Sequence, residues 1–168
     1  MLDQKTFLQG INYLKANYLN WSFDLNNDLM IKVWYKKFNK LEPNIFINLV
    51  EKYTETNKYA PNSPADLLEV LKDQLEKKEL NANQAWQLIN DLKYKHSFEL
   101  GAREIYLELE NKPALYKTVK EFERDIKDAK RGDTYIMDAF KKAYQNNLKH
   151  LANEQLCLMT GSSILFLD

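Results

Sequence analysis

The residues that come nearest to a metal-binding pattern are Asp24, Asn26 and Asp28, whose side-chain oxygens imitate the first ligands of a calcium loop. Such a loop also needs a glycine for its sharp turn and an acidic residue to close it. Leu29 stands in place of that glycine and Tyr35 in place of the closing acid. The sequence therefore predicts no calcium site, and we expect no bound metal.

Groups for nucleophilic or acid–base catalysis are sparse in this sequence. His96 and His150 are far apart, and neither lies in an H-E-x-x-H pattern. Cys157 is the only cysteine, which excludes an intrachain disulfide and a C-x-x-C redox pair. The carboxylates lie among lysines, as Glu123 does four residues before Lys127, and this spacing is typical of solvated helix pairs. We expect no enzymatic activity.

The sequence also contains no phosphate-binding glycine motif and no excess of basic residues. The 4 glycines form neither G-x-x-x-x-G-K-[ST] nor G-x-G-x-x-G, so we expect no nucleotide and no other cofactor. The formal net charge is zero, with 24 Lys and Arg against 24 Asp and Glu. Lys32, Lys36 and Lys40 form one row of lysines, and a second row within 117–131 is interspersed with acids. We expect no strong direct binding of nucleic acid.

The spacing of apolar residues indicates helices along nearly the whole chain. Apolar side chains recur every three or four residues, which is the period of one buried helix face. With 4 Gly and 4 Pro in 168 residues, the chain lacks the turn residues that many short strands require. We predict an all-α fold, an N-terminal helical bundle followed by a C-terminal helical region with a long αα-hairpin. The predicted apolar stripes cover 7–18, 31–41, 46–53, 67–75, 85–92, 105–109, 115–129 and 137–151.

The polar run 76–83 separates two predicted domains, an N-terminal one over 1–80 and a C-terminal one over 81–155. Within the second, Arg131-Gly132-Asp133 offers a helix-ending glycine and a capping aspartate for the joint of the hairpin. Residues 156–168 form a tail that is uncharged as far as Asp168 and largely apolar, so it should pack on its own domain or meet a partner. Because no leader or membrane span is recognisable, we expect a cytoplasmic protein without membrane contact.

Most aromatic side chains fall on the predicted apolar stripes, and we expect Trp34 and Trp86 to pack in cores. Trp21, Tyr35 and Phe166 are the aromatic residues that we expect to be free to serve a surface.

Four short segments of the first half follow one another in an informative order and spacing. They are Asn20-Trp21-Ser22-Phe23, Ile31-Lys32-Val33-Trp34-Tyr35, Val50-Glu51-Lys52-Tyr53 and Tyr59-Ala60-Pro61, before a new helix at Ser63-Pro64. This part of the chain resembles the N-terminal helical domain of replicative-helicase loader and inhibitor proteins from phages of Gram-positive bacteria. In the second half, the segment Ala85-Trp86-Gln87-Leu88-Ile89 and the pair Phe140 and Tyr144 also look like that group.

The resemblance implies a non-enzymatic adaptor in the bacterial cytosol that binds the hexameric replicative DNA helicase. Such an adaptor inhibits the helicase off the origin and assists its loading in phage DNA replication, together with a phage origin-binding initiator. In the family, helicase contact is attributed to the C-terminal part. We expect apolar anchors on the last helix and tail, with lysines that set orientation. The expected partner-binding residues are Tyr144, Leu148, Leu151, Leu156, Met159, Leu165, Phe166, Lys141 and Lys142.

Two other functions are compatible with the sequence. A compact helical phage protein could inhibit a different host protein, such as the host helicase loader or a defence nuclease. The lysine rows could instead serve a single-strand-binding or origin-binding module, whose affinity would fall steeply with salt. For the helicase adaptor, we expect deletion of 155–168 to weaken helicase binding and to leave helical circular dichroism nearly unchanged.

Overall fold

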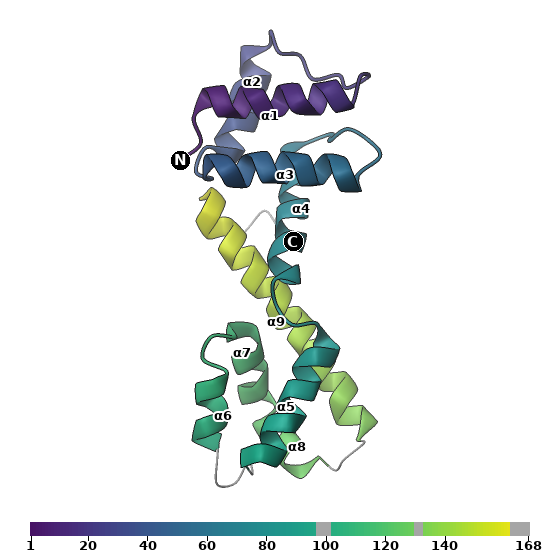
Figure 1. Cartoon of the computed structure of the whole chain (residues 1–168), viewed down its shortest axis with the longest axis vertical. Coiled ribbons are helices and arrows are strands. Elements are labelled where there is room, and N and C mark those ends of the chain that lie inside the picture. Colours follow the sequence, from purple (N-terminus) through teal and green to yellow (C-terminus); the bar gives the residue numbers. More distant parts are fainter. Residues whose placement is uncertain (97–101, 130–132, 162–168) are drawn as a thin grey trace. The chain divides into compact units, whose positions relative to one another are not determined.

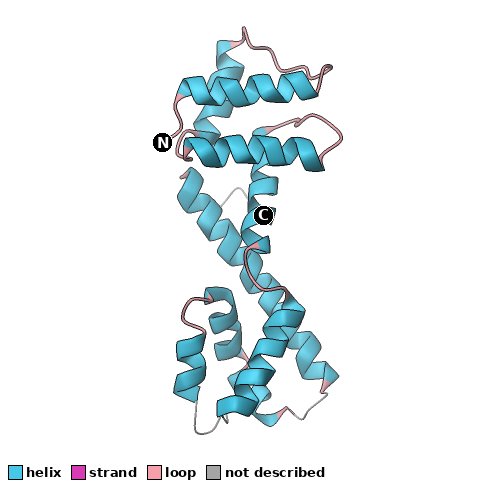
Figure 2. Ribbon diagram, viewed as in Figure 1, coloured by secondary structure: helices cyan, strands magenta, loops and turns pink. Residues whose placement is uncertain are grey.

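A computed structural model describes residues 1–96, 102–129 and 133–161, and every regular element in these ranges is an α-helix (Figure 1). Figure 2 shows the same ranges as helices and connecting loops. The predicted all-α fold is confirmed. The helices are α1 (Gln4–Asn17), α2 (Asp28–Phe38), α3 (Pro43–Thr56), α4 (Pro64–Lys77), α5 (Ala82–His96), α6 (Ala102–Glu108), α7 (Pro113–Glu121), α8 (Glu123–Asp128) and α9 (Thr134–Thr160).

The first three helices begin where their capping residues predict. The Asp3 carboxylate accepts a hydrogen bond from the backbone N–H of Thr6 at 2.9 Å, at the start of α1. The Asn27 side chain accepts one from the N–H of Met30 at 3.0 Å and starts α2. Pro43 lies in the first turn of α3, where its missing N–H costs no intrahelical hydrogen bond. Local sequence therefore fixes these boundaries.

The chain divides into two compact units. The first unit comprises Met1–Gln74 together with the C-terminal stretch from Asn153, and the second unit comprises Leu75–Ala152. The boundary thus runs through α4 and α9 and lies near the predicted one at residue 80. The predicted tail at 156–168 differs from the structure, because residues 156–160 are the last turns of α9 and count with the first unit. Residues 162–168 lie outside the described part.

Aromatic rings dominate the core of the first unit. Figure 1 shows α1 and α3 side by side, and the Phe7 ring of α1 lies 5.5 Å from the Phe46 ring of α3. Phe46 also meets Phe38 at 5.3 Å, and all three side chains are fully buried. Gly10 makes this approach possible, because a Cβ at that position would lie 2.5 Å from Cε1 of Phe46.

The segments that carry the family resemblance also pack inside the first unit. The rings of Trp21, Phe23 and Trp34 lie 4.8 to 5.5 Å apart, and Trp21 Nε1 donates a hydrogen bond to the Pro61 carbonyl at 2.8 Å. Tyr35 donates its hydroxyl to the Leu2 carbonyl at 2.8 Å. The expectation that Trp21 and Tyr35 are free for a surface is therefore wrong, and Phe166 lies outside the described residues. These aromatic residues therefore take part in the packing of the first unit.

The second unit has its own apolar core, drawn from α5, α6, α7, α8 and α9. The predicted hairpin is present, since Asn147 of α9 donates hydrogen bonds to the Thr118 hydroxyl and the Glu121 carboxylate, both at 3.0 Å. Its first arm, however, is two short helices rather than one long one. Phe122 leaves helical geometry with φ −107° and ψ 13°, and its ring lies 6.0 Å from that of Phe140.

A lysine closes the end of the second short helix. Lys93 Nζ of α5 donates hydrogen bonds to the carbonyls of Ile126 at 2.6 Å, Ala129 at 2.7 Å and Lys127 at 3.2 Å. These carbonyls have no partner further along a helix that ends at Asp128. The ammonium group also lies at the negative end of the helix dipole. Lys93 thereby holds the short α8 against α5.

Candidate functional site

Two of the predicted partner-binding residues lie in cores. Tyr144 is 1% exposed, and its hydroxyl donates to the Leu80 carbonyl at 2.8 Å. Burial, and secondarily the charge of Glu79, raises the pKa of Tyr144 to about 12. Leu156 is also 1% exposed. The prediction of an accessible surface at these two residues needs correction, because each faces the inside of its own unit.

The other residues predicted to bind a partner lie at the edge of a core, at the surface, or outside the described residues. Leu148 and Leu151 are half-buried against the core of the second unit. Lys141 is half-buried and Lys142 is exposed. Leu165 and Phe166 lie outside the described residues. Met159, the remaining residue, is half-buried and lines a pocket.

That pocket lies where the end of α9 meets the corner between α2 and α3, and we call it the α9-end pocket. Its volume is about 450 Å³. Leu158 is 83% exposed and Met1 is 84% exposed, so the pocket has apolar side chains at the surface. Its lining residues are Met1, Lys40, Leu41, Glu42, Ile45, Leu158 and Met159.

The local chain explains why these residues converge. The backbone N–H of Leu2 donates to the Asn39 carbonyl at 3.1 Å, which ties the N-terminus to the end of α2 and brings Met1 to the pocket. The N–H of Leu41 donates to the Phe38 carbonyl at 2.8 Å and closes the turn before α3. Lys40 and Glu42 flank the buried Leu41 and are both exposed. The pocket therefore combines an apolar floor with one charge of each sign, an arrangement that suits a protein side chain.

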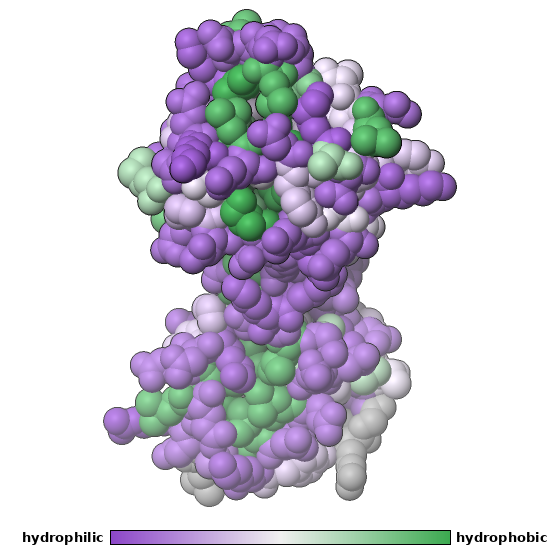
Figure 3. All heavy atoms as spheres, turned by 45° about the horizontal axis from the view of Figure 1, so that its top comes forward, coloured by the Kyte–Doolittle hydropathy of each residue, from purple (hydrophilic) through white to green (hydrophobic). Residues whose placement is uncertain are grey.

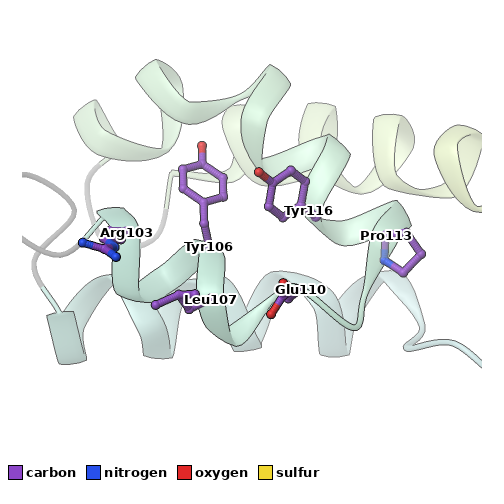
Figure 4. A pocket seen from close by; sticks show the side chains of 6 residues that line it. All are labelled: Arg103, Tyr106, Leu107, Glu110, Pro113 and Tyr116. Atoms are coloured by element: carbon purple, nitrogen blue, oxygen red, sulfur yellow. The ribbon is translucent and has the colours of Figure 1, made fainter.

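A second concavity lies between α6 and α7 in the second unit, and we call it the α6–α7 cleft (Figure 4). Its volume is about 510 Å³. Figure 4 shows Tyr106 and Tyr116 pointing to the same side, and their ring centroids are 5.2 Å apart. The cleft is lined by Arg103, Tyr106, Leu107, Glu110, Pro113 and Tyr116.

Tyr106 is fixed within the cleft by a hydrogen bond to α8. Its hydroxyl donates to Glu123 Oε2 at 2.8 Å, and Glu123 Oε1 lies 3.1 Å from Lys127 Nζ. Burial, and then the bond to Glu123, raises the pKa of Tyr106, while the Tyr106 hydroxyl and Lys127 lower the pKa of Glu123. The spacing of apolar residues predicts Tyr106 on an apolar stripe but gives no sign of the cleft, because it does not report that Leu107 stays exposed.

Polar groups elsewhere form a small surface network. His96 Nε2 and Lys95 Nζ both lie 2.8 Å from Glu108 Oε1. The hydrogen bonds from Lys95, and then from His96, lower the pKa of Glu108. Over 1–96, 102–129 and 133–161, no group of three or more His, Cys, Asp or Glu side chains could hold a metal ion.

Hydrophobic side chains reach the surface in both units, as Figure 3 shows in green. None of the helices in the described ranges has the length and apolarity needed to cross a membrane. No protein-family model, curated protein or solved structure matches this chain. The α9-end pocket and the α6–α7 cleft both have exposed apolar side chains and are candidate binding sites within the described residues.

Proposed function

We propose that the chain is a non-enzymatic adaptor that binds a hexameric replicative DNA helicase, inhibits it off the origin and assists its loading. The proposal is supported by the order and spacing of the signature segments in the first half. The observation that links the proposal to a site is the α9-end pocket, where the exposed Leu158 lies beside Met159, a half-buried residue among the predicted anchors. The C-terminal end of the chain is also the part to which the resemblance assigns helicase contact.

The pocket is suited to hold one apolar side chain of a helicase subunit. Burial of Leu158 and Met1 removes apolar surface from water, which is a favourable and non-directional contribution. Lys40 and Glu42 at the rim give the contact its orientation and raise the association rate. If the adaptor binds one conformation of the helicase ring more tightly than another, it shifts the ring toward that state without any catalytic residue.

The first test is size-exclusion chromatography with light scattering on the full chain mixed with a hexameric bacterial replicative helicase, with ATP and without DNA. A complex whose mass exceeds that of the helicase alone supports the proposal. Separate elution of folded protein and folded helicase contradicts it. That outcome would favour the alternative, a helical phage inhibitor of another host protein such as the helicase loader or a defence nuclease.

Point substitutions locate the contact better than the truncation at 155, because Leu156, Cys157 and Thr160 are buried and their loss would disturb the first unit. We expect Leu158→Ser to weaken helicase binding about tenfold, a typical effect of removing an apolar anchor. Leu19→Ser is the matched control, since Leu19 is 89% exposed in the same unit but lies outside the pocket. Unchanged affinity of the Leu158 variant, with circular dichroism unchanged in both proteins, would refute this placement.

A further inference from the structure

A stripe of three side chains, Arg103, Leu107 and Glu110, has an apolar residue between two opposite charges. Arg103 and Leu107 lie one helical turn apart on α6, and Glu110 lies two residues beyond its end, in the turn before α7. Figure 4 shows Leu107 between Arg103 and Glu110, whereas Tyr106 points from the same helix toward the side of Tyr116. Leu107 is 59% exposed and Tyr116 is 37% exposed. This stripe and the two tyrosines form the accessible part of the α6–α7 cleft.

The two charged side chains of the stripe, Arg103 and Glu110, form no ion pair within the described part of the chain. Neither the Arg103 guanidinium nor the Glu110 carboxylate has an ion pair or a side-chain hydrogen bond there, and both residues are exposed. The neighbouring acids behave differently. Glu108 is bound by Lys95 and His96, and Glu123 by Tyr106 and Lys127. Within the described part of the chain, the stripe thus offers one cation and one anion that have no charged partner.

This arrangement is self-complementary. In a two-fold symmetric contact, residue i meets residue j and residue j meets residue i. If two copies of α6 lie antiparallel, Arg103 of one copy faces Glu110 of the other, and the reverse pair forms at the opposite end. Leu107, which lies between the two charges, then meets its own copy near the two-fold axis. The same surface therefore supplies both halves of the contact.

The cleft is also held in shape before any partner arrives. The Tyr106 hydroxyl is bound by Glu123, and the Tyr106 ring packs against Tyr116 at 5.2 Å. Pro113, in the first turn of α7, limits the backbone at the rim. A preformed surface loses less conformational entropy on binding than a flexible one.

We propose that this chain forms a two-fold dimer through the α6–α7 cleft, with Arg103 of each copy paired with Glu110 of the other and Leu107 at the centre. Because α6 is short, the contact is smaller than a standard interface of about 800 Å² per partner. The dimer is therefore weak and depends on concentration. It uses the second unit and is independent of the α9-end pocket, so its failure would leave the helicase proposal untouched.

The test is sedimentation equilibrium of the full chain from about 10 µM to about 1 mM, a range suited to a weak complex. We expect the average mass to rise from one copy toward two. Arg103→Glu and Glu110→Arg each place like charges opposite one another, and each raises the dissociation constant about tenfold. Glu104→Arg is the control for Glu110→Arg, because it makes the same charge change at an exposed residue outside the cleft and leaves dimerisation within about twofold.

Variants that recover the dimer test whether Arg103 of one copy faces Glu110 of the other. The double variant Arg103→Glu with Glu110→Arg exchanges the charges and regains the dimer. An equimolar mixture of the two single variants also forms a dimer, because every opposed pair is then complementary. The proposal is overturned if the unmodified chain has the mass of one copy throughout the range. It is equally overturned if neither the double variant nor the mixture regains association, an outcome that would leave the cleft to a foreign protein segment.

Discussion

The smallest decisive feature of the first unit is the absence of a side chain at Gly10. An alanine at an exposed helix site stabilises a helix by about 1 kcal/mol relative to glycine. At position 10 the added Cβ would press on the fully buried ring of Phe46, and overpacking of this kind costs about 1–3 kcal/mol. We predict that Gly10→Ala lowers the free energy of unfolding, measured by urea denaturation. Asn12→Ala, at an exposed site of the same helix, should leave it unchanged or raise it slightly.

At the same scale, Tyr144 gives the second unit a pH dependence. Tyr144→Phe keeps the buried ring but leaves the Leu80 carbonyl without its donor, so we expect a loss of about 1–2 kcal/mol near neutral pH. The folded protein holds the phenol proton up to a pKa of about 12, whereas an unfolded tyrosine releases it near 10. The stability from this raised pKa is complete below pH ~10 and is lost as the pH rises toward 12.

The difference in unfolding free energy between wild type and Tyr144→Phe should therefore shrink between pH ~9 and pH ~11. Denaturation of both proteins at these two values measures it. A difference that stays constant or widens would show that the phenol of Tyr144 does not titrate as its buried position implies.

At the scale of helices, the spacing of apolar residues predicted where helices form but not where a helix breaks. Val119, Phe122 and Ile126 keep the spacing of three and four residues across the end of α7, so the pattern indicates one helix where the chain forms two. The break depends on contacts that spacing does not report, including the Phe122 ring on Phe140. The same limit applies to the partner-binding site. The apolar pattern places Tyr144 on a helical stripe and Leu156 in an apolar tail, but it does not say which segment covers either residue.

Lys93 is the element-scale contact that we expect to matter most for α8. Lys93→Met keeps most of the apolar stem and removes three hydrogen bonds to the end of α8. We predict a loss of about 1–3 kcal/mol of unfolding free energy and faster amide exchange in α8. Lys95→Met removes an ion pair between exposed side chains and should cost no more than about 0.5 kcal/mol. Equal effects of the two substitutions would contradict the capping role of Lys93.

At the scale of the whole molecule, the division of the chain is asymmetric. Among the described residues, the buried core of the second unit runs from Ala85 to Tyr144, so a fragment of residues 75–152 contains all of them. The first unit instead takes its last part from beyond residue 152, including the buried Leu156 and Cys157. Local composition predicts a single boundary at the polar run 76–83, because it carries no sign that residues beyond 152 belong with the first unit.

This asymmetry makes a prediction for isolated fragments. We expect the fragment 75–152 to unfold cooperatively on its own, as followed by circular dichroism at the helical minimum. The fragment 1–74 lacks Leu156 and Cys157 and should be less stable than the first unit in the full chain, since removing buried apolar side chains costs about 2–5 kcal/mol each for large residues. Joining residues 153–161 to 1–74 through a flexible linker should restore part of that stability. If 1–74 is as stable alone as within the full chain, the end of α9 does not stabilise the first unit. That result would contradict the packing of α9 that forms the α9-end pocket.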